Sequence, residues 1–342
     1  MHAPRATSRD VARLAGVAQS TVSYALAGKG SISAETRERV QRAADQLQYQ
    51  PNLAARAMRT RRTGRVAAVM GLPLYDPAAM LAGASAAAQA AGYLMDVLHV
   101  DGSIETRSER VLELARSGQF EGVLSFTPLL PGVAEHAPTG APVAVSETFD
   151  DEMHAAGELV DASPVVAFVE HLAALGHARF LHVAGPSQYA SAVARRSAYL
   201  ATVERLGLES LGVVEGDWSG QTGLVAIRSL PDDAPPLAVV ASNDLVAVGV
   251  MRGAAERGWS VPGDVSVTGW DNADVGPYLT PSLTTVDTDR AEAGRRAMRQ
   301  LVGALNEEAV SQGLRPLTTI IWRESTAPPS GRTARARPAV AL

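Results

Sequence analysis

The sequence predicts an α/β protein with a small all-α head in residues 1–49 and a larger, doubly wound α/β body of two lobes. Three observations support this class. Short capped helical patterns fill the head, buried strands alternate with helical patterns from Val66 onward, and the two regions carry opposite net charge. At 342 residues the chain is long enough for two or three domains.

The first helix is expected to begin after Thr7 and to end at Gly16. Thr7 and Asp10 have the spacing of a capping box, which satisfies unpaired amide groups at a helix start. Glycine adopts the left-handed conformation that ends a helix at little cost. The apolar face of this helix is predicted to consist of Val11, Leu14 and Ala15.

Two further helices complete the predicted head. The second is expected to bury Val22, Ala25 and Leu26. The third is capped by Ser33 and adds Val40, Ala44 and Leu47 to a small core. Two short helices joined by a tight glycine-containing turn are typical of a helix-turn-helix, which lays its second helix in the major groove of DNA.

The charge distribution supports this interpretation. Residues 1–62 hold eleven Arg and Lys against four Asp and Glu, a net of +7, whereas the whole chain carries −5, so the remainder carries −12. A basic head on an acidic body is expected of a phosphate-binding module joined to a sensor. The alternative is a solvated basic face on an ordinary helical bundle.

The head resembles that of the LacI/GalR family of bacterial repressors, and the resemblance continues along nearly the whole chain. No single motif is specific, but together they are. The motifs that carry it are Asp10-Val11-Ala12, Ala15-Gly16-Val17, Ser20-Thr21-Val22-Ser23, Glu35-Thr36-Arg37-Glu38-Arg39-Val40 and Tyr49-Gln50-Pro51-Asn52.

The resemblance implies that the second helix reads DNA bases. The residues expected to reach base edges in the major groove are Gln19, Ser20 and Tyr24, and those expected at phosphates are Thr7, Thr21 and Ser23. Tyr24 departs from the Arg or His of many family members, so the usual arginine contact to guanine is absent. Ala18 is a second departure, because a hydroxyl residue often caps the reading helix there.

Residues 50–63 resemble the hinge helix and linker of the family. In the family, the hinge helices of a dimer pair in the minor groove and wedge an apolar side chain into a base step. Asn52 is expected to cap this helix, Met58 to supply the wedge in place of the usual Leu, Arg59 to lie along the minor groove and Arg56 to contact a phosphate. So short a helix should fold only on DNA. The alternative is a plain linker.

The body is predicted to contain two similar lobes with parallel sheets, because it has too many strands for one sheet. No Gly-x-Gly-x-x-Gly opens a helix after the first strand, which weighs against a dinucleotide enzyme. The predicted helices span 81–91 and 165–175. The predicted strands span 66–70, 94–100, 122–126, 142–146, 180–184, 211–214, 238–241 and 265–269.

Residues 64–328 resemble the periplasmic-binding-protein-like effector-binding and dimerisation domain of the same family. Three chain crossings are expected between the lobes, near Asp161, Asp287-Thr288 and Trp322-Arg323. The N-terminal lobe would comprise 64–160 and 289–321, the C-terminal lobe 162–287 and 323–328, and residues 329–342 a disordered tail. Ligands of such open sheets bind at the carboxyl ends of strands, here in a cleft between the lobes.

The positions that match the family's effector site offer carboxylate, amide, guanidinium and aromatic groups. The first three suit hydroxyl recognition, and an indole face suits the apolar face of a sugar ring. In lactose-repressor-like members a sugar-binding Arg likewise precedes an aromatic residue, as Arg195 precedes Tyr199 here. The candidates are Tyr75, Asp76, Glu147, Arg195, Trp218, Asn243, Asp244, Trp270 and Asp271.

Structural roles are the alternatives at several of these positions. Trp218 and Trp270 would then be core or interface residues, Asp244 a helix cap, and Asp271 with Arg195 a structural ion pair. His177 is predicted to be structural. Residues 72–80 lack the common Asn-Pro-Phe-Phe pattern of the family, which leaves the role of Tyr75 and Asp76 open.

Several classes of protein are excluded or disfavoured by what the sequence lacks. It has no cysteine, no metal-ligand spacing among its seven His and no Gly-x-Ser-x-Gly elbow, so no metal, cofactor or enzymatic activity is expected. It shows no apolar run of about 18 residues and no apolar signal segment, so a cytoplasmic, nucleoid-associated protein is expected.

These observations predict a ligand-responsive transcription repressor that binds a pseudo-palindromic operator as a homodimer. Its predicted partners are double-stranded DNA and a small-molecule effector, with a carbohydrate favoured by Trp218 and Glu147. A purine-type corepressed regulator or an activator of the same fold stays open. A sugar-binding protein without a DNA function is the alternative from another class.

Overall fold

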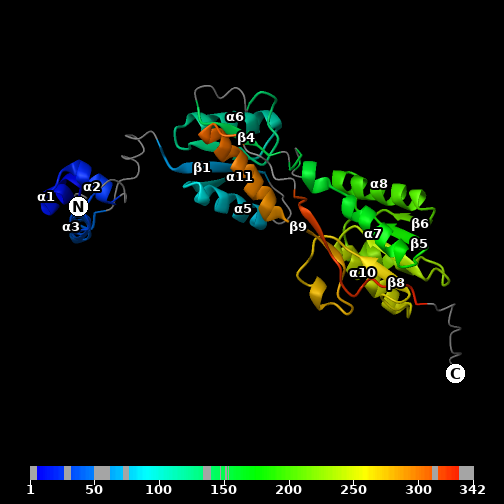
Figure 1. Cartoon of the computed structure of the whole chain (residues 1–342). Coiled ribbons are helices and arrows are strands. Elements are labelled where there is room, and N and C mark those ends of the chain that lie inside the picture. Colours follow the sequence, from blue (N-terminus) through cyan, green and yellow to red (C-terminus); the bar gives the residue numbers. More distant parts are fainter. Residues whose placement is uncertain are drawn as a thin grey trace. The chain divides into compact units, whose positions relative to one another are not determined.

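A computed structural model describes residues 6–26, 32–49, 62–71, 77–133, 140–146, 148–150, 152, 154–309 and 315–330. The chain divides into two compact units, Met1–Gly64 and Arg65–Leu342, each of which is described by itself (Figure 1). In the first unit α1 (Ser8–Ala15), α2 (Gln19–Leu26) and α3 (Ala34–Gln46) pack around one small core, so the predicted helix-turn-helix head is confirmed.

The first helix has the predicted boundaries. The Asp10 carboxylate accepts hydrogen bonds from the backbone amide (2.9 Å) and the hydroxyl (2.6 Å) of Thr7, and Gly16 has φ +63° at the helix end. The predicted burial of Leu14 is wrong, because that side chain is 47% exposed and Ala12 is buried instead. The buried face of α1 consists of Val11, Ala12 and Ala15, and Leu14 lies at the border of this face.

The N-lobe of the second unit holds a four-stranded parallel sheet in the order β2-β1-β3-β4. Its strands are β1 (Arg65–Met70), β2 (Leu94–His99), β3 (Gly122–Ser125) and β4 (Val143–Val145). Its helices are α5 (Pro77–Ala90), α6 (Ile104–Arg116) and α11 (Arg290–Asn306), so the helix predicted to begin at residue 81 begins at Pro77. In Figure 1, α11 (orange) lies beside α5 (cyan), and their side chains share one core cluster.

The C-lobe repeats this plan, with a parallel sheet in the order β6-β5-β7-β8. Its strands are β5 (Arg179–Val183), β6 (Glu209–Val214), β7 (Leu237–Ala241) and β8 (Val265–Thr268). Its helices are α7 (Ser163–Ala174), α8 (Ala190–Arg205), α9 (Gly220–Arg228) and α10 (Asp244–Glu256). Two apolar clusters pack on this sheet. The two-lobed α/β class predicted from strand number is therefore confirmed.

The chain passes between the lobes at three places. A 3-10 turn, η1 (Gly157–Val160), precedes Asp161, whose carboxylate accepts from the amide and hydroxyl of Ser163 and from the Thr318 hydroxyl at 3.2 Å. The other two crossings, β9 (Thr285–Thr288) and β10 (Thr318–Ile321), pair antiparallel. After β10 the chain returns to the C-lobe, where the backbone amide of Val267 donates to the Ser325 carbonyl.

Candidate functional site

The second helix of the head divides into a buried and an exposed face. Val22 and Ala25 are buried, whereas Gln19, Ser20 and Tyr24 are exposed, Tyr24 to 56%. The Gln19 amide nitrogen donates to the Ser8 hydroxyl at 2.7 Å, which ties the start of α2 to α1. The apolar side of the helix thus forms the core, and the polar side presents side chains that are long enough to reach base edges.

The residues predicted at phosphates have more varied surroundings. Thr21 and Ser23 are half-buried on α2, while the Thr7 hydroxyl is engaged by Asp10 at the start of α1. α2 begins directly after Ala18, which supplies no capping hydroxyl. The predicted hinge residues Asn52, Arg56, Met58 and Arg59 and the predicted effector residues Tyr75, Asp76 and Glu147 lie outside the described residues.

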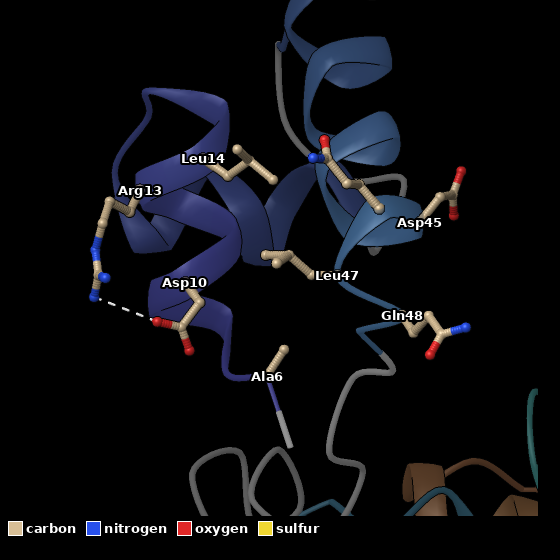
Figure 2. A pocket seen from close by; sticks show the side chains of 8 residues that line it. Ala6, Asp10, Arg13, Leu14, Asp45, Leu47 and Gln48 are labelled. Carbon is tan, nitrogen blue, oxygen red and sulfur yellow. Dashed lines mark ion pairs between the residues drawn. The ribbon is translucent and has the colours of Figure 1, made fainter. Parts of the chain in front are cut away.

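A hollow of about 910 Å³ opens on the head between α1 and the end of α3 (Figure 2). Leu14 and Leu47 form its apolar part, and an ion pair of 3.3 Å between Arg13 and Asp10 lies at its edge. Ala6, Asp45, Gln46 and Gln48 complete the lining. It includes none of the predicted base-reading or effector residues, so it is a feature of the head surface and not the predicted site.

In the C-lobe, α8 places Arg195 beside the carboxyl ends of β7 and β8. The guanidinium donates to the Ser242 carbonyl at 2.6 Å and lies 3.7 Å from the centre of the Trp270 ring. The Trp218 ring lies 5.9 Å away. Arg195 is only 8% exposed, and burial lowers its pKa to about 10 because the charged form is poorly solvated there. The structure therefore brings three of the predicted effector residues together.

Backbone strain is concentrated around the same loops. Trp218, Asp271 and Asn272 have φ values of +67°, +103° and +48°, and they are three of the five non-glycine residues with positive φ in the described part of the chain. Such conformations persist only where the surroundings impose them, and they gather at ligand sites. The Asp271 amide donates to the Val286 carbonyl at 2.9 Å, which fixes this loop on the crossing strand β9.

Asp271 joins the two lobes electrostatically. Arg290, at the start of α11 in the N-lobe, lies 3.5 Å from its carboxylate. Burial raises the pKa of Asp271, and the positive charges of Arg195 and Arg290 oppose that rise. Next to it, the Asn272 side chain accepts from the Arg323 guanidinium at 2.7 Å.

Asn243 and Asp244 organise loops through hydrogen bonds. Asn243 caps α10 by accepting from the Val246 amide at 2.8 Å, and its side-chain nitrogen donates to the Trp218 carbonyl. The buried Asp244 carboxylate accepts from the Thr285 hydroxyl (2.5 Å) and the Ala273 amide (2.7 Å). Burial raises the pKa of Asp244 to about 6. These contacts agree with structural roles, and a contact of either residue with an effector stays a prediction.

The aromatic and histidine candidates differ in their burial and in their contacts. Trp270 is 3% exposed inside an apolar cluster, whereas Trp218 is half-buried and packs edge-on against Tyr189 at 5.9 Å. His177 is buried with Nε2 3.0 Å from the Ala327 carbonyl, and burial lowers its pKa, as expected of a structural residue. In the described residues, no group of three or more His, Asp or Glu could hold a metal ion.

Sequence reasoning did not assign Tyr189, Asn272 or Arg290 to the site, and it expected Arg323 only at a chain crossing. Tyr189 touches Trp218 on one side and the His154 ring, 4.4 Å away, on the other. Arg290 follows the second crossing and opens α11, so its position at a lobe boundary was the one available signal. Nothing in its local pattern distinguishes it from a surface arginine, because its partner Asp271 lies in the other lobe.

Comparisons with known protein families cover both units. A family described as "Bacterial regulatory proteins, lacI family" matches residues 7–52, and one described as "Periplasmic binding protein-like domain" matches residues 169–326. The HTH-type transcriptional repressor CytR of Escherichia coli is 31% identical over 332 residues, which cover 94% of this chain and 96% of that protein. The HTH-type transcriptional regulator CelR of Thermobifida fusca is 31% identical over 328 residues, covering 89% and 93%.

Solved structures give the same result for the fold. A lac repressor dimer bound to operator and the anti-inducer ONPF has a TM-score of 0.70, with 27% identity over 95% of this chain and 100% of that chain. A complex of the transcriptional regulator CelR with cellobiose has a TM-score of 0.53, with 27% identity over 94% and 100%.

Proposed function

This chain belongs to the lacI family of bacterial regulatory proteins, DNA-binding transcription regulators, and we propose that it represses transcription as a homodimer on a pseudo-palindromic operator, under control of a carbohydrate effector. The observation that supports DNA reading best is the polarity of α2. Its apolar side is buried, and Gln19, Ser20 and Tyr24 stand exposed on the other side. Thr7, Thr21 and Ser23 are proposed to contact phosphates, which fix orientation.

Residues 50–63 are proposed to act as hinge helix and linker, with Asn52, Arg56, Met58 and Arg59 at the minor groove. The body, residues 64–328, is proposed to bind the effector and to dimerise. Effector binding would favour one arrangement of the lobes and operator DNA another, so that each ligand weakens or strengthens the binding of the other. The protein would act by binding alone, without catalysis, and in the cytoplasm at the nucleoid.

The carbohydrate proposal rests on a group of side chains at the carboxyl ends of the C-lobe strands and on the effectors named for similar proteins. Arg195, Trp218, Asn243 and Asp271 offer the donors, acceptors and indole face that recognise a sugar. CelR has been solved with cellobiose, and the lactose and ribose operon repressors of Escherichia coli are 28% identical to this chain. Among the described residues, no helix is both long and apolar enough to cross a bilayer.

A gel-shift assay with the DNA that flanks its own gene tests the DNA-binding proposal. We expect a specific complex, weakened about 5- to 150-fold by Ser20→Ala, because a good base contact contributes about 1–3 kcal/mol. Gln41→Ala, an exposed change on α3 that removes a hydrogen bond to Asp45, is the matched control and should leave affinity unchanged. Equal loss in both variants would remove the assigned role of Ser20.

Thermal-shift measurements with cellobiose, lactose and ribose against hypoxanthine and cytidine test the effector class. One of the sugars should raise the melting temperature. Stabilisation by hypoxanthine alone would favour the purine-type alternative, and stabilisation by hypoxanthine or cytidine without any sugar would end the carbohydrate proposal, while leaving DNA binding intact.

A further inference from the structure

A side-chain hydrogen bond joins the first residues of α1 and α2. The amide nitrogen Nε2 of Gln19, which opens α2, donates to the hydroxyl of Ser8, which opens α1, at 2.7 Å. Gln19 is exposed and Ser8 is half-buried, and neither belongs to the apolar core of the head. The bond therefore connects a residue that is proposed to read bases with one that has no role in the proposed function.

The Ser8 side chain is available for this bond because other residues cap α1. Thr7 is the N-cap residue, and the Asp10 carboxylate accepts from its amide and its hydroxyl. Ser8 is the first residue inside the helix, where a side-chain hydroxyl is not needed for capping. The bond also fixes the start of α2, which follows Ala18 and so has no capping hydroxyl of its own.

The bond distinguishes the two ends of the Gln19 amide. Nε2 is held at Ser8, so the amide keeps Oε1 as an acceptor and the second Nε2 hydrogen as a donor. An acceptor next to a donor matches adenine, which offers the N6 amino group as donor and N7 as acceptor in the major groove. Guanine offers two acceptors on this edge, O6 and N7, so Oε1 would face another acceptor there.

The same bond orders a flexible side chain before DNA is bound. A free glutamine side chain loses rotamer freedom when it docks on a base, and this loss weakens binding. With Nε2 already held by Ser8, part of that entropy is lost when the head folds and not when the operator binds. A distance of 2.7 Å is typical of a well-formed hydrogen bond.

We propose that Ser8 is a positioning residue for base reading, whose hydroxyl holds the Gln19 amide in the orientation that selects adenine in each half-site of the operator. The inference rests on the proposed function, since it takes Gln19 as a residue that reads bases. Ser8 contacts no base itself and acts through Gln19. It adds to the proposed function a residue of α1 and the identity of one base pair.

Selection of DNA duplexes by the full-length protein tests which base the pair recognises. The pool is randomised over about 20 base pairs, the span of two half-sites one helical turn apart. The wild type should select adenine at one position of each half-site, and Gln19→Ala should lose this preference. Ser8→Ala should weaken the same preference and leave the other positions unchanged, whereas Ser8→Thr keeps the hydroxyl and should retain it. Gln41→Ala, an exposed change on α3, is the control and should select as the wild type does.

Gel shifts with the selected duplex measure whether Ser8 acts through Gln19. Ser8→Ala should weaken binding about 2- to 12-fold for each half-site, the factor that corresponds to ordering one flexible side chain. When Ser8→Ala is added to Gln19→Ala, affinity should fall no further, because the side chain that Ser8 positions is already absent. Ser8→Thr should bind within about 2-fold of the wild type, because its hydroxyl can accept the same bond.

The contrary outcomes separate this inference from the function on which it rests. If Ser8→Ala weakens binding equally for every duplex, or adds its full loss to that of Gln19→Ala, the hydroxyl acts on a phosphate or on the fold and the inference fails. It also fails if Ser8→Ala selects and binds as the wild type does, or if guanine is selected where Gln19 reads.

Two further outcomes concern the proposed function itself. If Gln19→Ala leaves every base preference unchanged, the assigned role of Gln19 fails together with the inference, while a specific duplex selected by the wild type keeps operator binding. If the wild type selects no duplex, operator binding itself is contradicted.

Discussion

The two lobes of the body have the same fold, but the pKa of a carboxyl group is lowered in one lobe and raised in the other. Both sheets have the same strand order, and in both a pair of helices crosses so closely that glycines are needed at the contact. In the N-lobe, Glu292 accepts from Arg295, Arg296 and Arg299 on its own helix, and hydrogen bonding from Arg295 lowers its pKa to about 2. In the C-lobe, burial raises the pKa of Asp244 to about 6.

The strained backbone is also unevenly distributed. Of the four described non-glycine residues of the body with positive φ, Trp218, Asp271 and Asn272 belong to the C-lobe, together with the buried Arg195, and the fourth, Glu307, ends α11 in the N-lobe. A common fold therefore does not dictate where strain and poorly solvated charge collect. Their concentration at the carboxyl ends of β6, β7 and β8 is what a binding site requires, because preorganised polar groups cost stability that packing elsewhere must supply.

The largest expected effect tests the shared packing. A methyl group on Gly249 would lie 1.8 Å from the Gly220 carbonyl oxygen between α10 and α9, and one on Gly294 would lie 2.0 Å from the Met80 carbonyl oxygen between α11 and α5. Gly249→Ala and Gly294→Ala should each lower the free energy of unfolding by about 3 kcal/mol or more, because backbone must move apart. Urea unfolding measures both.

Gly253→Ala is the matched control for this pair. On the same helix as Gly249, its added methyl would lie 2.9 Å from the Ile227 Cβ and 3.2 Å from the Leu224 carbonyl oxygen, a smaller overlap than the 1.8 Å approach at Gly249, so its cost should be smaller. If Gly294→Ala leaves the free energy of unfolding unchanged while Gly249→Ala lowers it, the N-lobe helices are not held as closely as those of the C-lobe.

The next effect tests the raised pKa of Asp244. Since burial raises its pKa from the ordinary 3.8 to about 6 in the folded protein, the folded state holds this proton more tightly. Its contribution to stability is therefore largest below pH 4 and is lost as the pH rises to about 6, by about 2–3 kcal/mol. Asp244→Asn should not show this loss when urea midpoints are measured from pH 4 to pH 7. The exposed Asp233→Asn should follow the wild type.

Glu292 should show the opposite pH dependence. Its pKa is lowered from 4.5 to about 2, so its ion pairs stabilise the fold above pH 4.5 and the benefit is lost as the pH falls toward 2. Glu292→Gln should lower the free energy of unfolding by about 1–2 kcal/mol at pH 7 and by progressively less in acid. Glu308→Gln, at an exposed position just after α11, serves as control. A constant difference at all pH values would contradict the assignment.

The sequence predicted the features that depend on short stretches of chain. The cap at Thr7, the break at Gly16 and the buried strands follow from neighbouring residues, and the structure confirms them within a few residues. Leu14 was assigned to the core because periodicity alone cannot show where the face of a short helix ends. The number of strands predicted two lobes, although the crossing strands β9 and β10 were expected only as points of passage.

The site was less predictable because its contacts join distant segments. Family resemblance suggested Arg195, Trp218 and Asp271, and in the structure the Trp218 ring lies 5.9 Å from the Arg195 guanidinium, whose positive charge also acts on Asp271. Asp271 has its positive φ where its backbone amide donates to the Val286 carbonyl of the crossing strand β9, and Arg290, two residues after that strand, lies 3.5 Å from its carboxylate. No spacing in the sequence encodes such an approach, since the residues involved belong to different lobes.

The smallest expected effect compares two equivalent helix caps. Ser103 accepts from the Thr106 amide at the start of α6, and Ser219 accepts from the Thr222 amide at the start of α9, both at 3.4 Å. Ser103→Ala and Ser219→Ala should each cost about 0.5–1 kcal/mol, the lower part of the range for lost caps, because both bonds are long. Urea unfolding checks the pair against Ser103→Thr and Ser219→Thr, which keep the hydroxyl. A clearly larger cost for Ser219→Ala would show that its neighbour Trp218 depends on this cap for its strained conformation, so that the lobes differ even where their local geometry matches.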